Sequence, residues 1–96
     1  MLERAVARAL MDAATREGLY IRKCRWEGRV GAPDYCILHG GRAFFIETKA
    51  PGERPRASQL AEFSAIRSAG VPVWVVDSIP AAVAAVRAIA IGEDNG

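Results

Sequence analysis

Three charged residues at the ends of apolar strand sequence have the types and spacing for metal-assisted chemistry on phosphate esters. Residues 43–46 are apolar and predict a strand that is buried on both faces, and Glu47 and Lys49 follow at once. Side chains alternate along a strand, so these two share one face. Asp34 opens the preceding strand, directly after Pro33. Pairing of the two strands would bring a lysine and two carboxylates to one end of a sheet.

A hairpin is expected to set the register of that pairing. Residues 35–38 and 43–48 predict two strands, and the intervening His39-Gly40-Gly41-Arg42 is typical of a tight turn. Counting outward from the two glycines places residue 34 opposite residue 47 in an antiparallel pair. We therefore expect Asp34 and Glu47 to be neighbours near the open end of the hairpin, with the lysine just beyond them.

Two carboxylates side by side at the edge of a core cost free energy unless a cation neutralises them. Mg²⁺ prefers oxygen ligands, takes one or two carboxylates and keeps several waters, which suits phosphodiester hydrolysis. The backbone carbonyl of Thr48 would add a ligand, and Lys49 would orient or deprotonate the attacking water or stabilise charge on the phosphorus. The same spacing also fits an ordinary ion pair between Glu47 and Lys49, with Asp34 capping a turn beside Pro33.

The elements that must position these residues follow from hydrophobic periodicity and from turn residues. The sequence predicts an α/β fold in the order α-β-β-β-α-β-α, in which helices flank a small mixed sheet. The last strand is expected to be parallel to a neighbour, because a crossover helix precedes it. The predicted helices cover residues 2–17, 56–69 and 78–90, and the predicted strands cover residues 19–26, 35–38, 43–48 and 71–76. We expect one domain over residues 1–92 and a frayed tail over residues 93–96.

Composition and charge exclude several classes of protein. The 96 residues are 51% apolar and 25% charged, which excludes a disordered tail, a collagen-like repeat and a coiled coil. No apolar run approaches the ~18 residues of a membrane span, and the start of the chain lacks the pattern of a signal peptide. Two cysteines and one histidine exclude a disulfide framework and a zinc site. A net charge of +2 decides nothing, because 11 of the 13 basic residues are Arg and 18 residues are Ala, a general compositional bias.

The order of these motifs resembles a known family. Pro33-Asp34 followed by Glu47-Thr48-Lys49 resembles the signature of the PD-(D/E)xK nucleases, which have the restriction-endonuclease-like fold. With a glutamate in the first helix, Gly31-Ala32-Pro33-Asp34, a glutamine ten residues after the lysine and the strand at 70–76, residues 3 to about 85 resemble the virus-type replication-repair nuclease (VRR-NUC) domain. The same order is similar to that of archaeal Holliday-junction resolvases.

The resemblance implies a role for each matching residue in an endonuclease that depends on Mg²⁺ or Mn²⁺. Asp34 and Glu47 match the metal-binding carboxylates, and Lys49 matches the catalytic lysine. Glu3 matches a helix glutamate that completes the site, in part through a water, and Gln59 matches a glutamine that orients water or phosphate. Two plainer interpretations stay open: Glu3 as an exposed acid that favours a helix N-terminus, and Gln59 as a solvated helix residue.

Basic residues flank the predicted site and suit contact with the DNA backbone. They are Arg22, Lys23, Arg25 and Arg29 before Asp34, and Arg54 and Arg56 after Lys49. No helix-turn-helix or zinc finger is present, so we expect recognition of shape rather than of bases. A generic solvated basic face is the alternative. Trp26 would stack on an unpaired base or, as we prefer, pack inside the protein.

A domain of this size cannot grip a four-way junction alone, and two symmetric cuts suit a twofold dimer. The resemblance also implies a homodimeric Holliday-junction resolvase, and we expect one of phage or mobile-element origin that acts in DNA repair or recombination in the cytoplasm. The first helix or the last, with Val83, Val86 and Ile89, would supply the contact. The competing interpretations are a nuclease for flaps, nicks or single strands, and a non-catalytic DNA-binding module.

Overall fold

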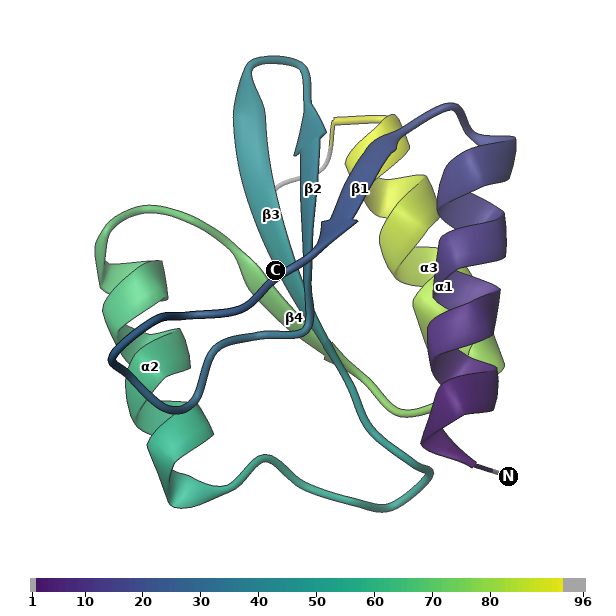
Figure 1. Ribbon diagram of the computed structural model, residues 1–96. Helices are drawn as coiled ribbons and strands as arrows, with labels where there is room; N and C mark the ends of the chain where they lie inside the picture. Colours follow the sequence, from purple (N-terminus) through teal and green to yellow (C-terminus); the bar gives the residue numbers. More distant parts are fainter. Residues whose placement is uncertain (1, 93–96) are drawn as a thin grey trace.

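A four-stranded sheet in the order β1-β2-β3-β4 lies at the centre of the molecule (Figure 1). The computed structural model describes residues 2–92, so the tail expected to fray lies outside the described residues. The elements are α1 (Glu3–Arg16), β1 (Tyr20–Lys23), β2 (Tyr35–His39), β3 (Arg42–Thr48), α2 (Ala57–Ser68), β4 (Val73–Val76) and α3 (Ile79–Ala90). The predicted order of helices and strands is confirmed, and β1 is shorter than expected.

The β2–β3 hairpin has the predicted register. Tyr35 pairs with Ile46 and Cys36 with Phe45, so continuing the ladder sets residue 34 opposite residue 47. The turn at Gly40 and Gly41 has φ angles of 61° and 77°, a left-handed conformation that two-residue hairpins require and that glycine adopts at low cost. The turn residues therefore determine which side chains meet at the open end.

Strand β4 lies parallel to β3, as expected, and α2 is the crossover between them (Figure 1). Thr48 pairs with Val76, and the ladder continues one residue further, where the Lys49 amide donates to the Val76 carbonyl at 2.9 Å. The pairing thus extends to the end of β3 that carries the charged residues, and it fixes the backbone on which they stand.

Helices α1 and α3 cover one face of the sheet, and α2 covers part of the other (Figure 1). Alternation along β3 directs Phe44 and Ile46 into the core beneath α1 and α3, while Phe45 and Glu47 lie on the α2 face. Phe45 is only partly buried, so the prediction of a β3 buried on both faces is wrong for this residue. The reason is that α2 covers one end of its face and leaves the hairpin end open.

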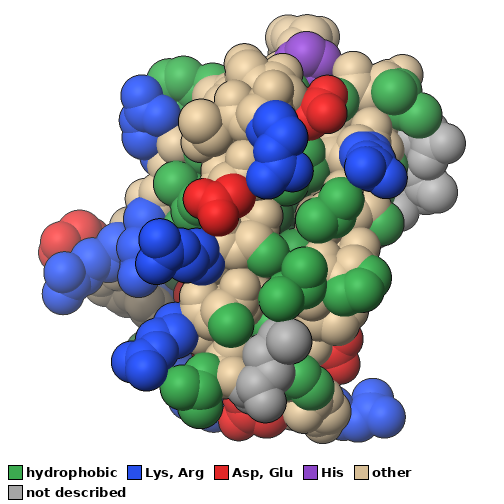
Figure 2. Space-filling model, turned by 90° about the vertical axis from the view of Figure 1, so that its right-hand side faces the viewer, with side chains coloured by type: hydrophobic (Ala, Val, Ile, Leu, Met, Phe, Trp, Pro, Cys, Tyr) green, Lys and Arg blue, Asp and Glu red, His purple; other side chains and the backbone are tan. Residues whose placement is uncertain are grey.

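The inner side of α3 corrects part of the expected dimer surface. Val86 and Ile89 are fully buried in the core, so they cannot contact a second copy in this fold. The alanine-rich α3 packs closely on α1 and on the sheet, which places these two residues inside, whereas Val83 stays partly exposed and helps to line a hollow of about 550 Å³ with Ile79 and Ile91. Figure 2 shows hydrophobic side chains across this side of the molecule, with basic ones most numerous at its left edge and others spread among them.

No helix within residues 2–92 is long and apolar enough to cross a membrane.

Gly31 lies where the segment between β1 and β2 packs against the backbone of α2. Its φ is 97°, and a Cβ atom there would overlap the backbone carbonyl of Ser58 in the first turn of α2. Backbone cannot move aside as a flexible side chain can, so glycine is needed here both for its conformation and for its size. This contact holds the segment that leads into Asp34 against the helix.

We expect Gly31→Ala to lower the free energy of unfolding by about 3 kcal/mol, because a left-handed alanine adds to a steric clash. Gly28→Ala is the matched control: φ there is 74°, but nothing lies within 4 Å of the added Cβ atom. That variant should lose only about 1 kcal/mol. Urea unfolding followed by circular dichroism measures both, and equal losses would contradict the close approach.

Candidate active site

The centre of the site is the carboxylate of Glu47, which is 2% exposed. Its Oε2 accepts a hydrogen bond from Gln59 Nε2 at 2.7 Å and lies 3.1 Å from the ammonium of Lys49. Its Oε1 is also buried, yet no hydrogen-bond donor of the described residues reaches it. A buried carboxylate oxygen without a partner is costly, so this atom points to a ligand supplied from outside the chain.

Gln59 joins the two charged groups. Its Oε1 accepts from Lys49 Nζ at 3.0 Å and from the Arg56 amide at 2.9 Å, while its Nε2 binds Glu47. The amide side chain is therefore fixed at both ends, and it fixes the lysine and the glutamate in turn. The interpretation of Gln59 as a solvated helix residue is wrong, since the residue is 5% exposed. It stands in the first turn of α2, directed at the end of β3.

Asp34 is held at the same end of the sheet by β3 itself. Its Oδ2 accepts from the Thr48 amide at 3.0 Å and from the Thr48 hydroxyl at 2.8 Å. The prediction that Asp34 lies beside the end of β3 is confirmed, whereas the hydrogen bond from the Thr48 hydroxyl was not foreseen. Because the N–H and C=O of one strand residue point to the same edge, the Thr48 carbonyl lies on the side of Asp34.

Burial raises the pKa of Glu47, and the nearby charge of Asp34 raises it further. The hydrogen bond from Lys49 and its positive charge lower this pKa, and so does the hydrogen bond from Gln59. The balance leaves the pKa above its ordinary value, so the chain's own donors do not fully compensate the two carboxylates. A divalent cation would complete the compensation, and the donor set is the oxygen-rich kind that Mg²⁺ and Mn²⁺ accept.

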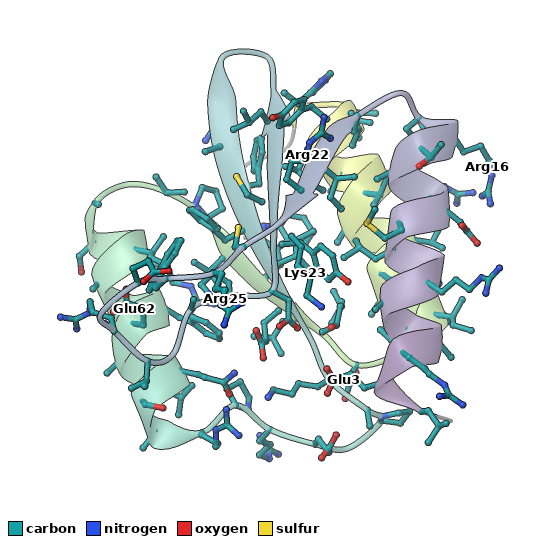
Figure 3. The ribbon with its side chains drawn as sticks, viewed as in Figure 1. Glu3, Arg16, Arg22, Lys23, Arg25 and Glu62 are labelled. Atoms are coloured by element: carbon teal, nitrogen blue, oxygen red, sulfur yellow. The ribbon has the colours of Figure 1, made fainter. Side chains whose placement is uncertain are left out.

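Glu3 stands apart from this pair, at the first turn of α1. Figure 3 shows it beside the chain that follows β3, and its charge, like that of Asp34, helps to raise the pKa of Tyr35 after the larger effect of burial. Among residues 2–92, no three His, Cys, Asp or Glu side chains cluster closely enough to hold an ion together. Of the expected ligands, Asp34, Glu47 and Thr48 lie together at one end of the sheet. Metal binding by them, like the role expected of Glu3, stays a prediction.

The six basic residues expected to bind DNA are all exposed. Their surroundings differ: the guanidinium of Arg22 lies 4.0 Å from the ring centre of Tyr20 and donates to the Ile21 carbonyl, while Arg29 is paired with a glutamate at 3.2 Å. Figure 3 shows Arg22, Lys23 and Arg25 following one another along β1 and into the next segment. Contact of these residues with DNA stays a prediction.

The partner of Arg29 is Glu62, a buried acid of α2 that was not foreseen as part of the site. Its Oε2 accepts from the indole of Trp26 at 2.6 Å, and its Oε1 accepts from Arg29. Trp26 also packs edge-on against Phe45 at 5.8 Å, so the preferred prediction of a packed tryptophan is confirmed. Glu62 lies one turn after Gln59 on α2, a spacing that places both on one helix face and that was visible in the sequence.

The comparisons with known proteins agree with this geometry. No family model matches the chain. The chain is 35% identical over 77 residues to a protein of Acyrthosiphon pisum secondary endosymbiont phage 1 named "Putative nuclease p44", with 79% of this chain and 83% of that protein covered. A solved structure described as "VRR_NUC domain" superposes with a TM-score of 0.72 at 32% identity, over 85% of this chain and 94% of that one.

This chain belongs to the VRR-NUC family. The predicted family and fold class are therefore confirmed, as is the broad prediction of a nuclease of VRR-NUC type. In this VRR-NUC domain the signature residues Asp34, Glu47 and Lys49 meet at one end of the sheet, and Gln59 is bonded to two of them.

We expect Glu62→Ala to destabilise the domain by about 2 kcal/mol, because it leaves the Trp26 indole and Arg29 without their acceptor. Glu62→Gln keeps an acceptor for the indole and should lose less. Glu27→Ala is the matched control, since it removes an exposed acid from the segment that carries Trp26 and Arg29. It should change stability by no more than about 0.5 kcal/mol. Urea unfolding compares the three variants. Equal stability of Glu62→Ala and wild type would show that Glu62 does not anchor this segment.

Proposed function

We propose that this VRR-NUC domain is an endodeoxyribonuclease that uses Mg²⁺ or Mn²⁺ to cut branched DNA, with four-way junctions preferred. The observation that carries the proposal is the buried Oε1 of Glu47, which lacks a partner beside a second carboxylate, Asp34. The ion pair between Glu47 and Lys49 uses only Oε2 and leaves Oε1 without a partner. The domain therefore has both the need for a cation and the ligands for one.

Asp34, Glu47 and the Thr48 carbonyl would hold the ion, and Glu3 would reach it through a water. When bound, the ion would supply a Lewis acid that polarises the scissile phosphate and lowers the pKa of the attacking water. No other described residue offers a carboxylate at this end of the sheet with the same burial as Glu47.

The chain's own contribution is a lysine held in place. The side chain of Lys49 is 12% exposed, and bonds to Gln59 and Glu47 fix its ammonium at the site. A fixed ammonium in a partly desolvated place stabilises negative charge on a phosphoryl oxygen more strongly than a mobile surface lysine does. Gln59 acts as the positioning residue, because its carbonyl orients the lysine and its amide orients the carboxylate.

The substrate part of the proposal rests on charge and on symmetry. The exposed arginines around the site suit contact with a phosphate backbone. The described residues form no element of the kind that reads bases. Two symmetric cuts across a junction need two copies, and we propose a homodimer that acts in the cytoplasm of an infected or lysogenic bacterium. The outer side of α3, with Ile79, Val83 and Ile91, carries apolar side chains for the contact. A monomer mass by light scattering, both free and on DNA, would contradict the dimer.

The central test is cleavage of a labelled four-way junction, a 5′-flap and a linear duplex of matched sequence. We expect paired symmetric cuts in the junction with Mg²⁺ or Mn²⁺ and none with EDTA. Lys49→Ala should slow cutting by at least about 100-fold, since it removes the positioned charge, and Asp34→Ala should abolish it. Arg16→Ala removes a basic residue that points away from the site in Figure 3, and it should cut like wild type.

Other outcomes of this assay separate the alternatives. Equal cutting of the flap would support a nuclease for flaps, nicks or single strands. Tight junction binding without cleavage in any metal would support a non-catalytic binding module and would contradict the enzymatic proposal.

Metal binding can be measured without DNA. At Mg²⁺ ten times its Kd, the native state gains about 1.4 kcal/mol, which should raise the melting temperature by roughly 5–10 °C in a domain of this size. Asp34→Asn should lose this shift because it removes one of two charged ligands. Asp12→Asn makes the same charge change at an exposed position of α1 and should keep the shift. An equal shift in all three proteins would mean that the ion binds elsewhere.

A further inference from the structure

We infer that Tyr20, with Arg22 against it, forms a stacking site for an unpaired base of the nucleic-acid substrate, on the open half of the sheet face that carries the metal ligands. The inference rests on the proposed function, and it names a class of substrate feature, a single-stranded arm or a splayed nucleotide, that would be bound beside the cut. Four observations carry it: the register, the exposure, the contact with Arg22 and the placement of Trp26.

The strand register places Tyr20 and the metal ligands on one face. Tyr20 pairs with Leu38, which pairs with Ala43, and this row lies at the hairpin end of the sheet. The next row on this face runs through Arg22 and Cys36 to Phe45. The row after that contains Asp34 and Glu47, since the Cys24 amide donates to the Asp34 carbonyl at 2.7 Å and continues the ladder.

Two rows along a strand correspond to about 13 Å. A nucleic-acid strand that leaves the metal site along this face would therefore reach Tyr20 within a few nucleotides.

Tyr20 and Leu38 form an uncovered apolar pair, 49% and 45% exposed. Helix α2 covers the opposite end of this face, and the segment between β1 and β2 crosses the sheet toward α2 (Figure 1). That segment covers Phe45 through Trp26 and leaves the Tyr20 row open. An exposed aromatic ring on a rigid strand, where no packing in the domain requires it, is the kind of surface on which a base stacks.

The contact with Arg22 adds charge to this surface. The guanidinium lies 4.0 Å from the ring centre of Tyr20, and its Nη1 donates to the Ile21 carbonyl at 2.8 Å, so the side chain is held against the ring. Arg25 follows as an exposed cation in the segment after β1. An aromatic platform with phosphate-neutralising charges beside it fits a nucleotide, whereas a purely apolar partner would leave these charges uncompensated.

Trp26, the aromatic residue that sequence reasoning offered for this role, is not free to play it. Its indole nitrogen is bonded to Glu62, and its ring packs against Phe45. Among the residues that the structure describes, the exposed large hydrophobic side chains include one aromatic ring, that of Tyr20. The inference therefore concerns this one position.

The test uses a junction with one single-stranded arm in which 2-aminopurine replaces successive bases. Binding is measured with the full-length Lys49→Ala protein in Mg²⁺, so that cutting is suppressed. We expect fluorescence quenching at one or two positions in the arm. Adding Tyr20→Ala should remove the quenching and weaken binding to the armed substrate about tenfold. Tyr20→Phe keeps the ring and should retain both. Binding to a blunt junction should be the same for all three proteins.

Leu60→Ala is the matched control for loss of an exposed apolar side chain, since Leu60 is 53% exposed on α2 and belongs to neither proposed contact. It should bind like the parent. An armed-substrate affinity unchanged by Tyr20→Ala, with melting temperatures equal, would overturn the stacking site. So would an equal loss on the blunt junction, which would indicate a general effect. Wild-type cleavage with either of these results leaves the nuclease proposal intact, while quenching that depends on Tyr20 without any wild-type cleavage would overturn the nuclease proposal alone.

Discussion

The buried carboxylate of Glu47 is the constraint on which the rest of the site depends. Removing a carboxylate from water is costly, and the cost is met only in part by one amide and one ammonium. The amide of Gln59 and the ammonium of Lys49 must therefore be held in fixed positions. The Gln59 side chain does this by bonding to both Glu47 and Lys49. The remaining buried oxygen has no hydrogen-bond partner among the described residues, and the proposed metal chemistry rests on this observation.

Helix α2 serves two structural purposes with one face. Gln59 in its first turn reaches the end of β3, and Glu62 one turn later holds the segment that precedes Asp34. The close approach of Gly31 to the backbone of Ser58 draws the same segment inward. The crossover that makes β4 parallel to β3 is thus also the element that positions Glu47 relative to Lys49. Phe63 of the same helix is fully buried, so apolar packing and these polar bonds together hold α2 in place.

Sequence reasoning succeeded where local chemistry determined the outcome. Two glycines at 40 and 41 determined the turn and hence the register that sets residue 34 opposite residue 47. It did not find Glu62, because an acid on a polar helix looks solvated until a distant tryptophan and arginine are known to approach it. It misplaced Val86 and Ile89 because alanine-rich α3 has apolar residues on several sides, and only the packing against α1 decides which side is inside.

The parallel pairing of β3 with β4 has a consequence for how the site comes into being. Asp34 and Glu47 are joined by a hairpin, so they are close in sequence as well as in space. The lysine's backbone is secured only when Lys49 bonds to Val76, and its ammonium only when Gln59 arrives on the crossover helix. A chain still emerging from the ribosome thus lacks the positioned ammonium until α2 and β4 have been made, so the complete site requires the last strand. Nuclease activity would therefore appear only when synthesis of the domain is nearly complete.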